Sequence, residues 1–477
     1  MLKTKYREYI AIAILLVLSA IPRFMHLGVS SYYGDETKVL FYKKVIPAKT
    51  FILEQRRGPV QYLVAWGAEK LSGGFEEENI RLPFAIAGLL AVVVFYLVAK
   101  NIVGVFPAFL ATILFSFNGF FIAFSRTVQY QSFLLLFGLS SILFAQLFIK
   151  YHKSYFLLVS AVFTVLGVVT HPDIIFYLLI STYYVYSEIR QGNLKWQVAA
   201  LWFFAPIALC SVVYYSTFYI LLKDNSEYSR YLEKRLTGEG LRNSNSLLTY
   251  FIYNPVVICG VYILFAFLSK APRVLIWWFC IPFLAFQVLF SNPGTHILNY
   301  IIPLFMLSTL GWLEVYQKSI KHRLKKMFLV VSCMALVIYV LSPFYFFNPM
   351  LNKGYPWVDT KFLGINISKI DQINYQLFVY GFPYRTQWKQ VRSYFDQNLN
   401  EQVSSYESND NMVVSAFYLY PKLLPAPGGN FKYYIYVKDS QTARMPAYDL
   451  LDKTLFQHQA ELDNGNIQIY KIVKKPK

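Results

Sequence analysis

The chain has 477 residues, of which 56% are hydrophobic, 19% aromatic and only 15% charged. Soluble domains carry about 25% charged residues, and a mean hydropathy of +0.39 over this length is too apolar for a water-soluble fold. The 45 Lys and Arg residues exceed the 26 Asp and Glu residues, which gives a net charge of +19. In a membrane protein such an excess collects at cytoplasmic helix ends and near anionic lipid headgroups, so no nucleic-acid partner is expected. The composition excludes a disordered chain, a disulfide scaffold and an ordinary cytosolic enzyme, and it predicts a polytopic membrane protein.

Apolar runs bounded by charged residues predict about eleven membrane-spanning helices, since a bilayer core needs about 20 apolar residues per helix. The expected spans are 9–27, 82–99, 102–124, 130–149, 154–170, 174–187, 196–222, 245–268, 274–291, 297–313 and 327–348. We expect their interiors to hold no charged residue, and the second half does not repeat the first. Both features count against an ion-coupled carrier.

Basic residues in the short connections predict the orientation. With the N-terminus in the cytoplasm, the inner loops carry Lys100, Lys150 with Lys153, Arg190 with Lys195, Lys270 with Arg273, and the cluster from Lys318 to Lys326. This register satisfies the positive-inside rule. It predicts a multi-pass protein of the plasma or inner membrane, with the loops 28–80 and 223–244 and the tail after residue 349 on the extracytoplasmic face.

The tail differs in composition from the rest of the chain. From about Asp359 onward charged and amide residues are frequent, and a polar pattern near 385–400 predicts a helix. Three stretches predict strands, and Pro and Gly residues between them predict turns: Met412–Leu419, Tyr433–Val437 and Ile467–Val473. We expect a transmembrane domain over residues 1–348 and a small extracytoplasmic α/β domain over residues 349–477.

Asp35 and Glu36 follow closely after the first expected span. Adjacent carboxylates repel, which raises the pKa of one of them, and such a pair suits a general base or a metal-assisted acceptor site. The alternative is a solvated helix N-terminus, where acidic residues are favoured.

Arg56 and Arg57 precede Gly58, Pro59 and Tyr62 in the same outer loop. Two guanidinium groups beside a Gly-Pro turn form a plausible phosphate clamp, because each can donate paired hydrogen bonds to phosphate oxygens. Anchoring to lipid headgroups is the alternative.

Further polar groups are expected at the outer ends of other spans. They are Arg126 with Gln131, His171 with Asp173, and His296 with Tyr300. A single histidine at a helix end is more often a hydrogen-bonded cap than a catalyst. Several such clusters on one face of an apolar bundle indicate a shared cavity.

Four short motifs in order resemble the GT-C superfamily of membrane glycosyltransferases, with the closest similarity to protein O-mannosyltransferases and the lipid A aminoarabinose transferase. They are Asp35–Glu36, the element Arg57–Gly58–Pro59 with Tyr62, Ile80–Arg81–Leu82–Pro83 with Ala87–Gly88, and Ser125–Arg126. The resemblance covers residues 20–310. It implies a hexosyl- or pentosyltransferase that takes a sugar from a polyprenyl-phosphate donor and gives it to a glycan, lipid or protein acceptor on the extracytoplasmic face.

The resemblance also implies roles for single residues. Asp35, with Glu36 beside it, activates the acceptor, while the donor phosphate is held by Arg57, Arg126, His296 and Tyr300. The substrate cavity includes Arg56, Tyr62, Gln131, His171 and Asp173. No cofactor is certain, and a divalent metal is left open because Gln131 stands where many relatives have an Asp.

Two other functions compete with this one. A lipid or polysaccharide flippase or transporter is disfavoured by the uncharged spans and the absence of repeats. A membrane acyltransferase using His171 or His296 would require a histidine deep in a span, whereas both lie at span ends. The particular sugar and acceptor do not follow from the sequence.

Overall fold

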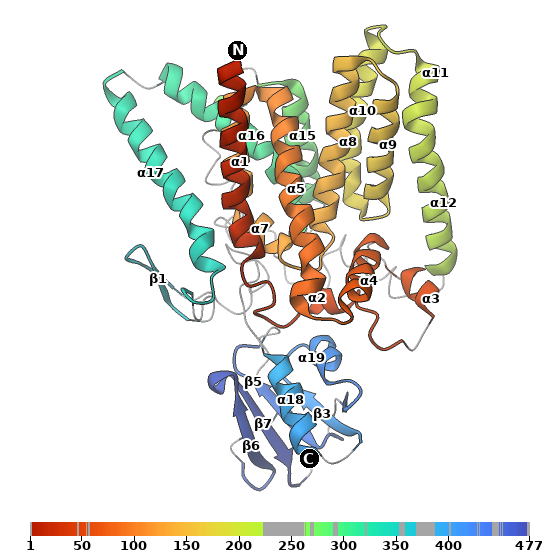
Figure 1. The fold of residues 1–477 in the computed structure, drawn as a ribbon, viewed down its shortest axis with the longest axis vertical. Helices are drawn as coiled ribbons and strands as arrows, with labels where there is room; N and C mark the ends of the chain where they lie inside the picture. Colours follow the sequence, from red (N-terminus) through yellow and green to blue (C-terminus); the bar gives the residue numbers. More distant parts are fainter. Residues whose placement is uncertain are drawn as a thin grey trace.

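The computed structural model describes a helical bundle with a small β-sheet domain at one end (Figure 1). The described residues are 2–44, 47–53, 55, 58–222, 262, 264–267, 271–289, 294–319, 322–352, 358–368, 387–399, 402–426, 428, 430–440, 448, 450 and 452–474. The expected span 245–268 and the loop 223–244 lie almost entirely outside these residues.

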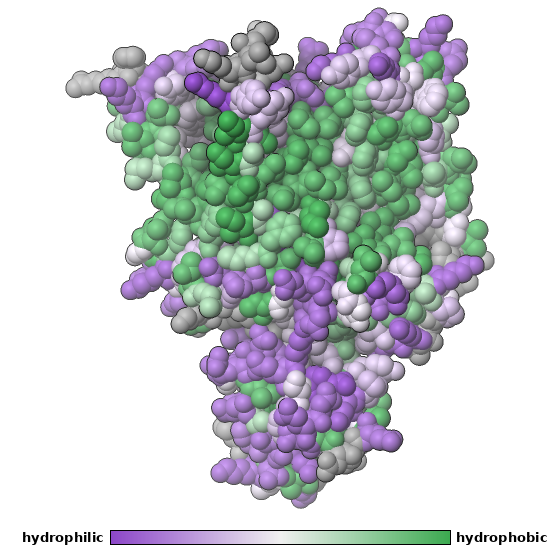
Figure 2. All heavy atoms as spheres, viewed as in Figure 1, coloured by the Kyte–Doolittle hydropathy of each residue, from purple (hydrophilic) through white to green (hydrophobic). Residues whose placement is uncertain are grey.

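Apolar helices of different lengths form the bundle, because inside a bilayer each segment must satisfy its own backbone hydrogen bonds. They are α1 (Leu2–Phe24), α5 (Glu77–Val103), α6 (Val105–Ser116), α7 (Gly119–Ser125), α8 (Gln131–Tyr151), α9 (Tyr155–Val168), α10 (Ile175–Arg190), α11 (Trp196–Ala199), α12 (Ala205–Leu222), α15 (Arg273–Leu284), α16 (Leu298–Glu314) and α17 (His322–Phe346). Figure 2 shows an apolar band across these helices with hydrophilic residues at both ends. This arrangement is that of a multi-pass membrane protein.

The expected count of about eleven spans is not confirmed. Among the described residues, five helices are long and apolar enough to cross a membrane, and a bent pair adds a sixth. That pair is α6 and α7, which meet at 62°, so the expected span 102–124 is broken near Phe117. Helices α9 and α15 are apolar but shorter.

A buried arginine lies near this break. Arg23 in α1 donates through Nη1 to the Ser116 carbonyl at the end of α6 (2.9 Å) and to the Ser19 hydroxyl (2.6 Å). It is fully buried, so the expectation of uncharged span interiors is wrong at this position. The helix break explains the exception, because a helix end inside the bundle leaves carbonyls that need a donor.

Short helices and loops collect at one end of the bundle. There lie α2 (Gly34–Thr37), α3 (Ala48–Leu53) and α4 (Val60–Ser72), together with the connections after α1, α7 and α9 and the start of α16. The N-terminus lies at the opposite end, and the C-terminal sheet lies beyond α2 and α4 (Figure 1). The structure thus places the outer-loop segments and the tail at one end of the molecule.

A five-stranded sheet of order β4-β3-β5-β7-β6 forms the C-terminal region. Its strands are β3 (Ser404–Ser408), β4 (Leu423–Pro425), β5 (Tyr433–Val437), β6 (Phe456–Leu462) and β7 (Ile467–Ile472). The helix α18 (Trp388–Asn398) and the last two predicted strands are confirmed. The predicted strand over Met412–Leu419 is wrong, since this segment is the helix α19. Asn411 begins the helix by accepting a hydrogen bond from the Val413 N–H, a capping signal that outweighs the β-branched residues that follow it.

The C-terminal region packs directly on the segments between α1 and α5. The Tyr418 hydroxyl of α19 accepts the Tyr32 N–H (2.8 Å) and donates to the Glu77 carboxylate (2.5 Å). Lys389 of α18 pairs with both Glu76 and Glu77. Tyr32 lies two residues before α2. These contacts therefore fix the backbone that leads into the helix with Asp35 and Glu36.

Candidate active site

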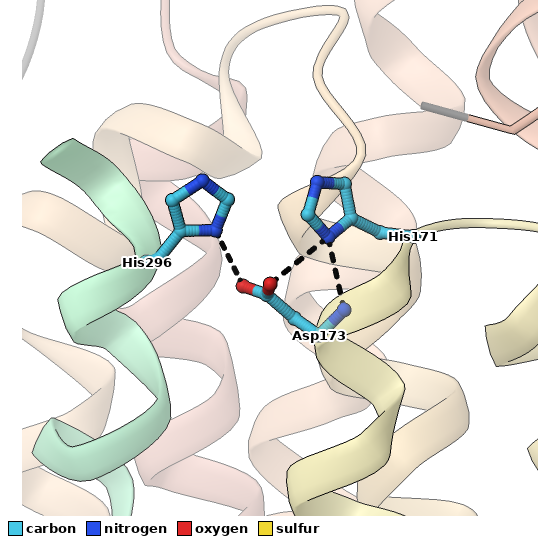
Figure 3. A group of neighbouring side chains, drawn as sticks. All are labelled: His171, Asp173 and His296. Atoms are coloured by element: carbon cyan, nitrogen blue, oxygen red, sulfur yellow. Dashed lines mark hydrogen bonds and ion pairs between the residues drawn. The ribbon is translucent and has the colours of Figure 1, made fainter. Parts of the chain in front are cut away.

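Two imidazoles and a carboxylate meet near the end of the bundle that carries the C-terminal sheet (Figure 3). His296 Nδ1 lies 2.7 Å from Asp173 Oδ2, and His171 Nδ1 lies 3.2 Å from Asp173 Oδ1. His171 and Asp173 come from the connection between α9 and α10, whereas His296 lies just before α16. His171 and Asp173 are buried and His296 is partly exposed. The expected convergence of these three residues is therefore present.

Asp173 is an ionised group in this cluster. Burial acts to raise the pKa of its carboxyl group, but the neighbouring His296 and His171 outweigh burial and hold that pKa well below its usual value. The Asn299 side-chain amide also donates to Asp173 Oδ2 (2.8 Å). The site is thus a carboxylate that two imidazoles and an amide hold in place.

His171 Nδ1 lies close to two atoms of Asp173. It is 3.1 Å from the backbone nitrogen and 3.2 Å from the carboxylate Oδ1. An unprotonated Nδ1 accepts the backbone N–H, and a protonated Nδ1 donates to the carboxylate. Both protonation states of His171 therefore keep a contact with Asp173.

Aromatic and amide side chains surround the histidines. The Tyr130 ring stacks on His171 with ring centres 3.9 Å apart and planes 8° apart, and Phe286 stacks on His296. Gln131 Nε2 donates to the Thr295 hydroxyl, next to His296. Gln131 Oε1 and Asn299 Oδ1 are buried and accept no hydrogen bond from the described residues. Two such acceptors beside one cluster suit a ligand with hydroxyl or amine donors.

The Gly-Pro turn of the outer loop packs against this site. Gly58 has a φ of +116°, and a Cβ there would lie 2.3 Å from the Val169 carbonyl oxygen and 2.7 Å from that of Thr170. Only glycine permits this approach to the segment that leads into His171. Arg56 and Arg57, the predicted phosphate clamp, lie outside the described residues.

Glu36 is fully buried in an ion pair with Arg81. Arg81 Nε and Nη2 donate to the two carboxylate oxygens at 2.9 and 2.8 Å. The backbone N–H groups of Tyr33 and Val128 donate to the same carboxylate at 2.6 and 2.8 Å. Four donors occupy the Glu36 oxygens, so the geometry favours a positioning role over the predicted partnership in catalysis.

Asp35 lies next to this ion pair, and its side chain is 26% exposed. Its Oδ1 accepts a hydrogen bond from Lys38 Nζ at 2.5 Å, one turn along α2. The two adjacent carboxylates therefore differ sharply in environment. Glu36 is enclosed, and Asp35 is partly exposed to solvent.

One short loop joins these parts of the site. The backbone of Val128 donates to Glu36, and its carbonyl accepts a hydrogen bond from Gln61 in α4. Two residues further on, Tyr130 stacks on His171. The loop between α7 and α8 thus connects the Asp35 helix, the segment after Gly58 and the histidine cluster.

Three other predicted site residues, Arg126, Tyr300 and Tyr62, make contacts with other parts of the protein. Arg126 donates to the carbonyls of Pro22 (2.8 Å) and Met25 (2.7 Å) at the end of α1 and borders a small pocket that opens to solvent. Tyr300 is fully buried in α16, where its hydroxyl accepts from Gln287 and its ring packs on Phe283. Tyr62 is buried in α4 against Phe51 and Phe41.

The sequence interpretation did not assign roles to Arg81, Tyr130 and Asn299. Arg81 had a detectable signal, because a charged residue at the start of an apolar run needs a buried partner. Tyr130 contacts His171, more than 40 positions away, and Asn299 contacts Asp173, more than 120 positions away. Contacts over such distances along the chain produce no local sequence pattern.

Known proteins resemble this chain in part of its sequence and in its fold. Residues 56–215 match the family model for dolichyl-phosphate-mannose-protein mannosyltransferases. No curated protein matches the sequence. Solved structures match over nearly the whole chain. ArnT from Cupriavidus metallidurans has a TM-score of 0.61 and 14% identity, covering 98% of each chain.

Two further structures have the same fold. The oligosaccharyltransferase AglB from Archaeoglobus fulgidus, in complex with an inhibitory peptide and a dolichol-phosphate, has a TM-score of 0.55 and 10% identity over 91% of this chain and 70% of its own. The arabinofuranosyltransferase AftD from Mycobacteria has a TM-score of 0.52 and 10% identity over 98% of this chain and 41% of its own. The chain therefore has the fold of the GT-C superfamily of membrane glycosyltransferases, and it is similar to the protein O-mannosyltransferases and to ArnT.

Proposed function

We propose that the protein is a glycosyltransferase that moves a hexosyl or pentosyl group from a polyprenyl-phosphate donor to a glycan, lipid or protein acceptor on the extracytoplasmic face. The observation that supports this most is the loop between α7 and α8, which joins the Asp35 helix to the histidine cluster. A structure of ArnT with bound undecaprenyl phosphate has the same fold, with a TM-score of 0.58. The flippase alternative is not favoured by these similarities.

The reaction exchanges one bond at the anomeric carbon for another. The bond from this carbon to the phosphate oxygen breaks, and the phosphate leaves with the electron pair. The acceptor hydroxyl or amine forms the new bond and loses its proton. Asp35 takes that proton, because it is the accessible carboxylate of the pair.

The departing phosphate needs positive charge or hydrogen-bond donors beside it. The sequence assigns this task to Arg57, and Gly58 packs next to the histidine segment. His296 and His171 lie at that segment and can donate when protonated. Gln131 and Asn299 present buried acceptors that suit the hydroxyl groups of the sugar.

A divalent cation fits the same cluster. His171, Asp173 and His296 each offer one ligand atom, and these atoms all lie within 4.8 Å of one another. Two imidazoles and a carboxylate with an open position suit zinc, and a related oligosaccharyltransferase structure contains zinc and sulfate. When bound, the cation would neutralise negative charge on the donor phosphate.

Replacement of Asp35 by Asn tests the proposal. Asn keeps the size of the side chain but accepts no proton, so we expect sugar transfer to fall about 10²–10⁴-fold, the usual loss of a general base. Donor binding and thermal stability should stay close to those of the parent protein. The assay uses purified protein in lipid, a panel of polyprenyl-phosphate sugars, and measurement of released polyprenyl phosphate.

A matched control is Asp396→Asn, since Asp396 also pairs with a basic residue on its own helix, Arg392. It should keep full activity. Near-normal transfer by Asp35→Asn at saturating donor and acceptor would contradict Asp35 as the base. No sugar release by the parent protein from any member of the panel would contradict the glycosyltransferase.

A further inference from the structure

A small hairpin follows the last bundle helix and carries an unusual surface. Its strands are β1 (Thr360–Phe362) and β2 (Ile365–Ile367), which pair antiparallel with Thr360 opposite Ile367 and Phe362 opposite Ile365. Directly opposed residues share one face of a sheet. One face therefore carries Thr360, Phe362, Ile365 and Ile367, and the other carries Lys361 and Asn366.

The apolar face is turned toward the end of α17. The Tyr345 hydroxyl lies 2.7 Å from the Thr360 hydroxyl, and the Phe362 ring packs against the rings of Tyr345 and Phe346. These contacts fix the direction of the hairpin. They leave Ile365 63% exposed, although it lies on the same apolar face.

More apolar side chains beside the hairpin are exposed. Leu363 at its tip is 60% exposed, Val358 before it is 54% exposed, and Leu351 and Met350 after α17 are 56% and 74% exposed. Leu363 also has a φ of +49° in the turn, where Asn would be usual. A soluble surface rarely collects large apolar residues in this way.

The hairpin lies where lipid would meet water. Only 11% of the apolar window of α17 is buried inside the bundle, so this helix presents most of its surface to lipid. In Figure 1 the hairpin lies just beyond the lower end of α17, level with α2 and α4, on the side away from α1. The exposed apolar side chains of the hairpin therefore lie beside the end of a helix that faces lipid, and Lys361 lies on the opposite face of the hairpin.

We propose that the hairpin 358–367 is an interfacial anchor, which inserts Leu363 and Ile365 into the membrane leaflet at the outer end of α17. Lys361 and Asn366 then remain among the headgroups and water. An amphipathic surface of this kind binds at the interface through its buried apolar area. The anchor holds residues 358–367 against the membrane, and it does not depend on the proposed reaction.

The test uses a fluorophore whose emission reports polarity. The four native cysteines are replaced by Ala, and a nitrobenzoxadiazole group is attached to Leu363→Cys, Ile365→Cys or Asn366→Cys. Each full-length variant is reconstituted into lipid nanodiscs with or without lipids that carry a nitroxide on the upper part of the acyl chain, below the headgroups. We expect blue-shifted emission and several-fold stronger quenching at positions 363 and 365 than at position 366.

Asn366 is the matched control, because it lies in the same strand as Ile365 but on the opposite face. Equal quenching at all three positions, or a water-like spectrum at positions 363 and 365, would overturn the proposal. The measurement is repeated in nanodiscs that hold a single copy of the protein. Loss of the blue shift there would identify a second copy, and not lipid, as the occupant of the apolar face.

Discussion

Neighbouring residues with the same charge have separate roles in this protein. Asp35 and Glu36 differ by one position, but only Glu36 turns inward to Arg81. A buried carboxylate requires a partner, and the bidentate guanidinium supplies one. Asp35 remains partly exposed and pairs with Lys38, which agrees with the proposed role as the base.

Glu36→Gln should therefore damage the fold where Asp35→Asn does not. The amide keeps the shape but leaves the Arg81 charge without a carboxylate, which should cost about 1.5–3 kcal/mol, the range for hydrogen bonds to charged groups. The measurement is the thermal midpoint of both variants in the same detergent. A midpoint for Glu36→Gln equal to that of Asp35→Asn would show that the ion pair does not stabilise the site.

The histidine cluster supports a second prediction at this scale. If it binds zinc, protein purified with added zinc and then desalted should contain about one equivalent, measured by mass spectrometry of the metal. His296→Ala should lower this content strongly because one of three ligands is lost. His152→Ala is the control, since His152 is exposed in the connection after α8. Equal metal content in both variants would leave the cluster as a hydrogen-bonded group only.

Secondary-structure elements from distant parts of the chain hold the Asp35 helix. Helix α19 contributes Tyr418, whose hydroxyl joins the Tyr32 N–H and Glu77, and burial and then Glu77 raise the pKa of that hydroxyl well above its usual value. Helix α18 contributes Trp388, whose backbone N–H donates to Ser31. The tail thus fixes the backbone on which α2 is built.

Tyr418→Phe removes one hydroxyl from this contact. The Tyr32 N–H and the Glu77 carboxylate both lose a buried partner, so we expect a loss of about 1–3 kcal/mol in stability, together with faster proteolysis between the bundle and the tail. Tyr420→Phe, at a half-exposed tyrosine two residues away, should change neither. Unchanged stability and proteolysis of Tyr418→Phe would mean that this hydroxyl does not hold the two parts together.

Sequence patterns predicted the elements that depend on neighbouring residues in the chain, and they missed those that depend on distant contacts. The apolar runs of α5 and α8 and the strands β5 and β7 follow from composition and periodicity. The break between α6 and α7 does not, because the Arg23 contact that satisfies the end of α6 spans 93 positions. The convergence of His171 and His296 was predicted only because span parity put both at one end, whereas the Glu36–Arg81 pair depends on packing that no pattern records.

At the scale of the whole molecule, different segments of the chain lie at the two ends of the bundle. One end has the N-terminus and the connection between α8 and α9, and the other has the candidate site and the sheet (Figure 1). The sheet shares one apolar cluster with the outer segments, in which Trp388 and Val391 pack with Tyr32 and Tyr62. The predicted boundary near residue 348 marks a change in composition. The regions on its two sides nevertheless share one apolar core.

The positive-inside pattern predicts which end faces the cytoplasm. Lys453 is exposed in the tail, and Lys153 is exposed in the connection between α8 and α9 at the opposite end. In a cysteine-free protein, Lys453→Cys should react with a membrane-impermeant maleimide on intact cells. Lys153→Cys should react only after permeabilisation, which provides the matched control. The reverse pattern would put the candidate site in the cytoplasm, where a donor presented on the extracytoplasmic leaflet could not reach it, so this measurement tests the proposed reaction as well as the topology.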